Sequence, residues 1–217
     1  MRPTMRVDIW SDVVCPWCYI GKRRFERAAD LLGDEVDLQI HYRPFQLDPT
    51  APLGAGRPVA EAYAAKFGGA ERATQILDHV TAVAAGEGLT FRMDLAVRAN
   101  TLAAHRLLWL AAATGHQLAL KERLLAAYFC EGVDLGDHDA LAACAAEVGL
   151  PADRVGAFLD GTDGAAQIAE QLVMASDADI TAVPTYVFDG RWAVPGAQDP
   201  DTFVSVVRRL LAQGSDR

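Results

Sequence analysis

Two cysteines stand three positions apart in the stretch that decides the fold, Val13-Val14-Cys15-Pro16-Trp17-Cys18-Tyr19-Ile20-Gly21-Lys22. An apolar, strand-like run (Val7 and Ile9, then Val13 and Val14) leads into the two cysteines, and a helix-like run follows them. Pro16 suits the first turn of that helix, where its missing N–H would have had no partner. Cys15 would then lie at the helix N-terminus. Cys18 would lie one turn further along on the same face, close enough for a disulfide.

The expected position of Cys15 has a chemical consequence. Backbone N–H groups and the positive end of the helix dipole at a helix N-terminus stabilise a thiolate. Cysteines in a Cys-x-x-Cys spacing therefore have pKa values lowered from about 8.5 into roughly the 3.5–7.5 range. We expect Cys15 to have a lowered pKa and to be the nucleophile, and Cys18 to resolve the mixed disulfide.

A structural zinc site is the alternative use of two cysteines at this spacing. Such a site needs four ligands, and the second pair is usually closely spaced. Cys130 and Cys144 are instead far away in the sequence and fourteen positions apart, and no His-x3–5-His pair exists. We therefore expect no metal. Cys130 and Cys144 are expected to be buried free thiols that are not joined to each other.

The composition is that of an ordinary globular protein of 217 residues, with 51% hydrophobic and 23% charged residues. The net charge of −9 argues against nucleic acid and anionic membrane surfaces as general partners. Residues 1–6 lead into the first strand without an apolar leader, and no apolar run is long enough to span a membrane. We expect a cytoplasmic protein, where Cys-x-x-Cys is typical of catalysis or metal binding.

The rest of the chain alternates between strand and helix signals. Residues 36–43 alternate apolar and polar side chains, which predicts a second strand, parallel to the first. Ala and Leu recur at helical spacing through residues 59–178, which predicts five to seven helices. Residues 183–188 and 191–194 predict two strands joined by an Asp-Gly turn, and a last helix begins near residues 199–201.

The helix after the two cysteines is expected to be amphipathic. The apolar positions expected to face the core are Ile20, Phe25, Ala28, Leu31 and Leu32. The charged positions expected to face water are Lys22, Arg23, Arg24 and Glu26.

These features resemble the thioredoxin superfamily, and the stretch Ser11-Asp12-Val13-Val14-Cys15-Pro16-Trp17-Cys18-Tyr19-Ile20-Gly21-Lys22 is similar to the FrnE-like branch of the DsbA family. The resemblance covers essentially the whole chain, because that family interrupts a thioredoxin fold (βαβ plus ββα) with a helical insertion. It implies an α/β protein with a thioredoxin-like domain in residues 1–50 and 179–217. Residues 51–178 would form the helical insertion domain.

The segment Ala182-Val183-Pro184-Thr185-Tyr186-Val187-Phe188 resembles the start of the third strand in this family. The resemblance implies that Pro184 is catalytic, has a cis peptide bond and lies against the cysteine pair; without it, trans would be the expected isomer. Val183 would bind an extended substrate through its backbone N–H and C=O groups. Pro16 and Trp17, between the cysteines, are further candidate substrate-binding residues.

Two polar segments have less certain roles. Residues 100–107 resemble the Asn-Thr-x-x-Ala-His-x-Leu segment of FrnE-like proteins, 2-hydroxychromene-2-carboxylate isomerases and kappa-class glutathione transferases. Asn100 either caps a helix or binds substrate beside the active site, and His105 is expected to be a hydrogen-bonded packing residue. Asp12 either caps the helix or relays a proton. Thioredoxin and DsbA have a buried acid where this chain has Ile9, so the proton route stays open.

The resemblance implies a dithiol–disulfide oxidoreductase that acts through Cys15 and Cys18 on polypeptide or small-molecule thiols and disulfides. It would need no cofactor, with glutathione as a conceivable co-substrate. One alternative is a glutathione-dependent isomerase or transferase of the 2-hydroxychromene-2-carboxylate isomerase type, whose members usually have Ser at the position of Cys15. Another is a non-catalytic module that binds polypeptide. The oligomeric state, a homodimer included, and the direction of electron flow stay open.

Overall fold

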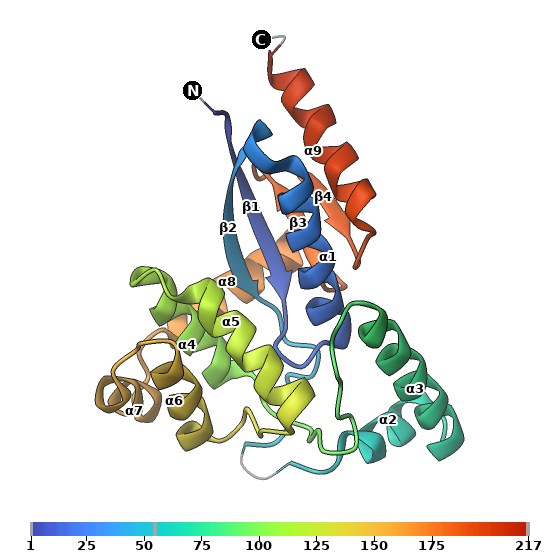
Figure 1. Cartoon of the computed structure of the whole chain (residues 1–217). Helices are drawn as coiled ribbons and strands as arrows, with labels where there is room; N and C mark the ends of the chain where they lie inside the picture. The colour runs from blue at the N-terminus through green and yellow to red at the C-terminus, as the bar shows by residue number, and fades with distance from the viewer. Residues whose placement is uncertain (1, 54–55, 216–217) are drawn as a thin grey trace.

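A computed structural model describes residues 2–53 and 56–215, and within these residues it contains a four-stranded mixed sheet in the order β2-β1-β3-β4 (Figure 1). The strands are β1 (Thr4–Ser11), β2 (Asp37–Pro44), β3 (Thr185–Phe188) and β4 (Trp192–Pro195). The central strand β1 pairs in parallel with β2 and antiparallel with β3, and β3 pairs antiparallel with β4.

Helix α1 (Pro16–Leu32) connects β1 to β2 and lies beside α9 (Pro200–Ser215) against the sheet (Figure 1). Alternation along β1 explains this layer: Val7 and Ile9 pack toward the two helices, whereas Trp10 packs with Ala175 on the other face. Phe25 of α1 is at the centre of an aromatic cluster. Its ring contacts those of Tyr186, Phe188 and Phe203.

The residues between β2 and β3 form seven α-helices in the part of the chain that the structure describes. They are α2 (Val59–Phe67), α3 (Ala70–Gly86), α4 (Leu102–Ala113), α5 (Gln117–Ala126), α6 (His138–Glu147), α7 (Ala152–Asp160) and α8 (Ala165–Asp177). A short π-helical turn, Ala127–Glu131, extends α5. The helix number agrees with the upper end of the sequence prediction. Among the described residues, no helix is both long enough and apolar enough to cross a membrane.

Helix α1 bridges two hydrophobic cores. Its first turns contribute Tyr19 and Ile20 to the core of the helical part, together with Val13 from the preceding turn. Its later turns contribute Phe25 and Leu32 to the core beneath the sheet. The two-cysteine stretch is therefore fixed where both cores meet.

Three sequence expectations for this region are wrong in detail. Val13 and Val14 form a turn rather than the end of the strand, because β1 ends at Ser11. Leu31 is 58% exposed at the end of α1. Lys22 is buried, because α5 covers it and supplies Glu122 as an ion-pair partner in addition to Glu26.

The predicted hairpin is confirmed. Asp189 and Gly190 both have positive φ angles, 48° and 68°, which are typical of the tight turns that join antiparallel strands. Arg191 N donates to Phe188 O across the turn at 3.0 Å. The Asp189 carboxylate accepts a hydrogen bond from Arg6 N at 2.9 Å, which joins the turn to β1.

Gly21 allows α1 to pack closely against the start of β3. A Cβ atom at this position would lie 2.7 Å from Tyr186 Oη and 3.0 Å from Pro184 Cγ. We predict that Gly21→Ala lowers the free energy of unfolding by about 1–3 kcal/mol, the usual effect of overpacking. Urea denaturation measures this.

Gly86→Ala is the matched control, because Gly86 also lies in a helix but a Cβ atom there would meet nothing within 4 Å. Alanine favours helix by up to about 1 kcal/mol over glycine, so this variant should be as stable as wild type or more stable. Equal stability of Gly21→Ala and wild type would contradict the close packing.

Candidate active site

The two thiols bracket the first turn of α1. Cys15 occupies the N-cap position, and Cys18 N donates to Cys15 O at 3.0 Å. Both side chains are buried, at 3% and 2% exposure, and both are free thiols. Of the two residues between them, Pro16 is buried as the first helical residue, whereas Trp17 is 37% exposed and its ring lies against that of His79 on α3.

The loop before β3 lies directly beside Cys15. The Cys15 thiol donates a hydrogen bond to Val183 O at a distance of 3.5 Å. The Val183–Pro184 peptide bond is cis. The pairing of Trp10 with Thr185 between β1 and β3 brings this loop to the end of β1. In the part of the chain that the structure describes, the N–H of Val183 has no hydrogen-bond partner.

The electrostatics of the thiol pair differ from the sequence expectation for Cys15. Burial raises the pKa of Cys15 well above its usual value, and the hydrogen bond and charge of Cys18 raise it further. Burial also opposes the ionisation of Cys18, but a hydrogen bond from Cys15, the charge of Lys121 and the Ser11 hydroxyl outweigh it and lower the pKa of Cys18. The positive charge of Lys121 and several hydrogen-bond donors act on the inner sulfur, so the thiolate belongs on Cys18.

Asp12 is fully buried and joins three segments. Its carboxylate accepts hydrogen bonds from Val13 N and Leu47 N, both at 2.8 Å. His105 Nε2 on α4 lies 3.1 Å from Asp12 Oδ1 and 3.0 Å from Phe45 O. Because both of these oxygens can only accept, Nε2 must carry the proton.

These contacts exclude one of the two roles left open for Asp12, that of a helix cap. Cys15 occupies the N-cap of α1 without a side-chain cap, so Asp12 does not cap this helix. Burial opposes ionisation of Asp12, yet the hydrogen bond and charge of His105 lower its pKa overall. His105 is buried and hydrogen-bonded, as expected, and its partner is this carboxylate.

Asn100 uses its amide within the protein. Its Oδ1 accepts from Leu102 N at 3.1 Å at the start of α4, and its Nδ2 donates to Ala51 O at 2.9 Å. The side chain therefore pairs with the backbone N–H of Leu102, the first residue of α4, and anchors the loop after β2. Cys130 and Cys144 lie in the turn after α5 and in α6, and both are free thiols. Cys144 is buried as expected, whereas the expectation for Cys130 is wrong because its side chain is partly exposed.

Sequence reasoning missed Lys121 on α5. The side chain is fully buried, and its Nζ has no hydrogen-bond partner among the described residues. The nearest aromatic contact is the ring of Tyr42, whose centroid lies 5.2 Å from Nζ. The available signal was positional: Lys121 falls on the apolar stripe of its helix. The other members of this stripe are Leu120, Leu124, Leu125 and Tyr128.

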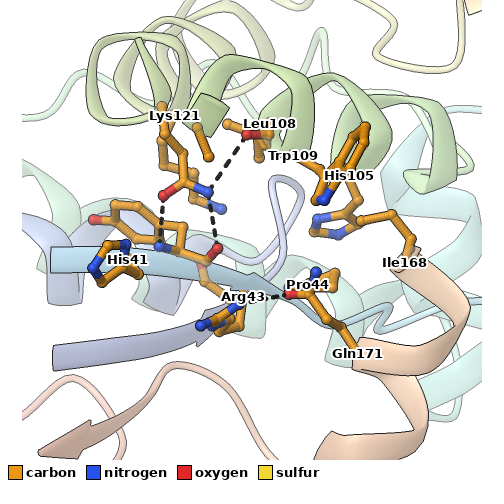
Figure 2. A pocket seen from close by; sticks show the side chains of 13 residues that line it. His41, Arg43, Pro44, His105, Leu108, Trp109, Lys121, Ile168 and Gln171 are labelled. Carbon is orange, nitrogen blue, oxygen red and sulfur yellow. Dashed lines mark hydrogen bonds between the residues drawn. The ribbon is translucent and has the colours of Figure 1, made fainter. Parts of the chain in front are cut away.

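Two cavities flank this region in the described part of the chain. One, of about 70 Å³, lies between β2 and helices α4, α5 and α8, and its walls include Ser11, His105 and Lys121 (Figure 2). The other, of about 540 Å³, is lined by residues that include Val14 and Tyr63. Burial and the charge of Cys15 raise the pKa of Tyr63 to about 12, so this larger recess adjoins the outer thiol.

Comparisons with known proteins agree on one family. A family model described as DSBA-like thioredoxin domain matches residues 6–208. A probable DsbA oxidoreductase from Streptomyces coelicolor is 33% identical, with a TM-score of 0.88 over 96% of this chain and 90% of that chain. The uncharacterized Bacillus subtilis protein YwbO is 28% identical over 94% of this chain and 96% of its own length.

A more distant structure is that of a 2-hydroxychromene-2-carboxylate isomerase. Its TM-score is 0.69 at 18% identity, over 97% of this chain and 98% of that chain. At 18% identity this similarity shows a shared fold and nothing more. Together with the strand order and the seven intervening helices, these similarities confirm the predicted thioredoxin fold interrupted by helices.

The Asp12 contacts generate a pH prediction. The pKa of Asp12 is lower in the folded than in the unfolded chain, so its stabilising effect is complete above about pH 4 and is lost as the pH falls through the folded value. We predict that Asp12→Asn lowers the free energy of unfolding at pH 7 by about 2–4 kcal/mol, because an amide cannot accept all three hydrogen bonds. Below about pH 4 the difference from wild type should shrink.

Urea denaturation at several pH values measures this difference. Asp30→Asn is the control, because Asp30 is an exposed carboxylate on α1. That variant should follow the wild-type curve. A wild-type advantage over Asp12→Asn that stays constant down to pH 3 would contradict a lowered pKa.

Proposed function

Because the chain belongs to the family of DSBA-like thioredoxin domains, in its FrnE-like branch, we propose that it is a dithiol–disulfide oxidoreductase that acts through Cys15 and Cys18. One observation carries the proposal: two thiols share the first turn of a helix, and the positive charge of Lys121 favours the thiolate of the inner one. A module that only binds polypeptide does not require two thiols with different pKa values.

The asymmetry assigns the roles of the two sulfurs. A thiolate from the substrate attacks Cys15 Sγ of the Cys15–Cys18 disulfide, and the bond breaks with Cys18 leaving as a thiolate. The thiol with the lower pKa leaves faster, so attack on Cys15 is favoured. A second substrate thiolate then attacks the substrate sulfur and releases Cys15. The substrate dithiol loses two electrons and becomes a disulfide, and the enzyme pair gains them. Reduction of a substrate is the reverse sequence.

The surroundings of Cys15 suit a weakly bound, extended substrate. Val183 O already contacts Cys15 Sγ, and its free N–H lies on the same loop, so a peptide can pair with this backbone as an added strand. Pro184 holds the loop against α1, and Trp17 offers an exposed apolar ring. Asn100 contributes by fixing the loop after β2. We propose that the substrate is a thiol or disulfide in the cytoplasm, on a polypeptide or on a modest apolar molecule. Glutathione would be the co-substrate that recycles the Cys15–Cys18 pair.

The exposed ring of Trp17 generates a prediction about binding. Trp17→Ala should raise KM for a peptide disulfide about 5- to 30-fold, the loss of roughly 1–2 kcal/mol of apolar contact, and should change kcat little. Trp192→Ala is the control, because Trp192 is 49% exposed on β4 and belongs to no part of the proposed site. Equal effects of the two variants on KM would argue against a substrate contact at Trp17.

The roles of the two thiols are tested by trapping. Removal of the resolving thiol should stop the reaction at the mixed disulfide, so Cys18→Ser should accumulate adducts on Cys15 in cell lysate. Cys15→Ser should lose dithiol-driven reduction of insulin. Non-reducing electrophoresis and peptide mass mapping detect the adducts.

Cys130→Ser and Cys144→Ser are the matched controls, because both residues are free thiols in the helical part. They should keep wild-type activity. Adducts on Cys18 in the Cys15→Ser variant, and none on Cys15 in the reverse variant, would reverse the roles. If wild type reduced nothing while Cys15→Ser catalysed a glutathione-dependent isomerisation, the isomerase alternative would replace this proposal.

A further inference from the structure

Lys121 is the one fully buried lysine in the described part of the chain. Burial of its charge is unfavourable for folding, and a function would explain why it is kept. An ammonium group without a hydrogen-bond partner is among the least favourable groups to bury. Burial accordingly lowers the pKa of Lys121, although the charges of Cys18, Asp12 and Cys15 act in the opposite direction. The neutral amine is thus accessible to this side chain, and a nearby anion would restore the ammonium.

Several titratable groups face Lys121 from the neighbouring elements. Among them, Cys18 is an anion that gains and loses its charge during turnover. Asp12 is already held by His105 and two backbone N–H groups. Lys22 on α1 is paired with Glu26 and Glu122. The titratable groups acting on Lys121 or sharing its cavity wall are Cys15, Cys18, Asp12, Lys22, His41, Tyr42, Arg43 and His105.

The cavity beside Lys121 is lined by residues of β2, α4, α5 and α8 and by Ser11, and neither Trp17 nor Val183 is among its lining residues. Figure 2 shows the cavity between β2 and the helices. On its wall, the Gln117 side chain accepts from the backbone N–H of Tyr42 and donates to its C=O. The cavity volume of about 70 Å³ is enough for a few water molecules, and the wall is polar at His41, Arg43 and Gln171. Ser11 belongs to this wall, and its hydroxyl lowers the pKa of Cys18, so the inner thiol lies behind Ser11 at this end of the cavity.

We propose that Lys121 is the proton acceptor for Cys18 and that the cavity between β2, α4, α5 and α8 is the route by which this proton reaches solvent. This inference rests on the proposed function and adds the proton path to it. The active site would then have two sides. Substrate approaches Cys15 past Val183, and the proton leaves from Cys18 past Lys121.

The step balances for the resolution of a mixed disulfide. Cys18 gives its thiol proton to the neutral amine of Lys121, through a water molecule in the cavity, and the amine becomes an ammonium. The Cys18 thiolate attacks Cys15 Sγ, the bond between Cys15 and the substrate sulfur breaks, and the substrate leaves as a thiolate that takes a proton from water. Lys121 then returns its proton to the cavity water. In the opposite direction, the ammonium stabilises Cys18 as it leaves.

The first test uses the wild-type protein. The chain has only three lysines, Lys22, Lys66 and Lys121, so the side-chain amines of isotope-labelled lysine can be resolved by NMR. We expect the pKa of Lys121 to be lower by about one unit or more in the disulfide form than in the reduced form, because oxidation removes the thiolate. Lys22 and Lys66 are internal controls and should titrate alike in both forms. A redox-independent titration of Lys121 would overturn the proposal.

The second test measures Cys18 directly, in a protein with Cys15→Ser, Cys130→Ser and Cys144→Ser so that Cys18 is the remaining thiol. Adding Lys121→Met, which keeps the apolar stem, should raise the pKa of Cys18 by about 1–3 units, as followed by the ultraviolet absorbance of the thiolate. Lys22→Met removes a different buried lysine and should leave this pKa within a few tenths of a unit. A role of Lys121 in packing alone predicts no shift of the Cys18 pKa.

The route is tested by chemical rescue of Lys121→Ala. Propylammonium is small enough to enter through the cavity and should restore the lowered pKa of Cys18, whereas tetrapropylammonium at the same ionic strength should not. If both ions change the pKa of Cys18 equally, or if neither changes it, the cavity is not the route to Lys121. These readouts need no substrate turnover, so they can fail while the oxidoreductase proposal stands, and they can succeed if it falls.

Discussion

The buried carboxylate of Asp12 is the interaction on which the site depends. Three segments that are distant in sequence donate to it: the turn before α1, the loop after β2 at Leu47, and α4 through His105. A buried carboxylate is tolerated only with such a complete set of donors. The turn that presents Cys15 is therefore fixed from three sides. This fixed turn, together with the pairing of β1 and β3, holds Cys15 against Val183.

The same interaction sets the direction of the electrostatics around the thiols. Because Asp12 is held by His105 and backbone groups, its negative charge remains near the thiols and opposes ionisation of Cys15. Lys121 supplies a positive charge that favours ionisation of Cys18. The helix N-terminus alone would have favoured the outer sulfur. Burial and Cys18 outweigh that preference at Cys15, whereas the hydrogen bond from Cys15 and the charge of Lys121 on α5 favour ionisation of Cys18.

Local signals in the sequence predicted the fold well, whereas the charges of the site depend on tertiary contacts. The strand, Cys-x-x-Cys and helix order, the Asp189-Gly190 turn and the helix number each follow from residues close in sequence. Lys22 looks like an exposed helix position until the fold brings Glu122 of α5 to it. The lowered pKa of Cys18 depends on nearby Cys15 and Ser11 and also on Lys121, which is more than one hundred residues away, so the pattern within its own helix could not indicate the whole effect.

The side chain of Gln117 limits the pairing of the edge strand β2 with strands of other chains. Strand β2 is at one edge of the sheet, and an edge strand with free backbone groups can pair with a foreign chain and aggregate. Gln117 occupies both the N–H and the C=O of Tyr42, at 2.9 and 3.0 Å, and so takes the place of a neighbouring strand at that point. A foreign chain therefore cannot pair with β2 at Tyr42, which limits edge-to-edge aggregation at this strand.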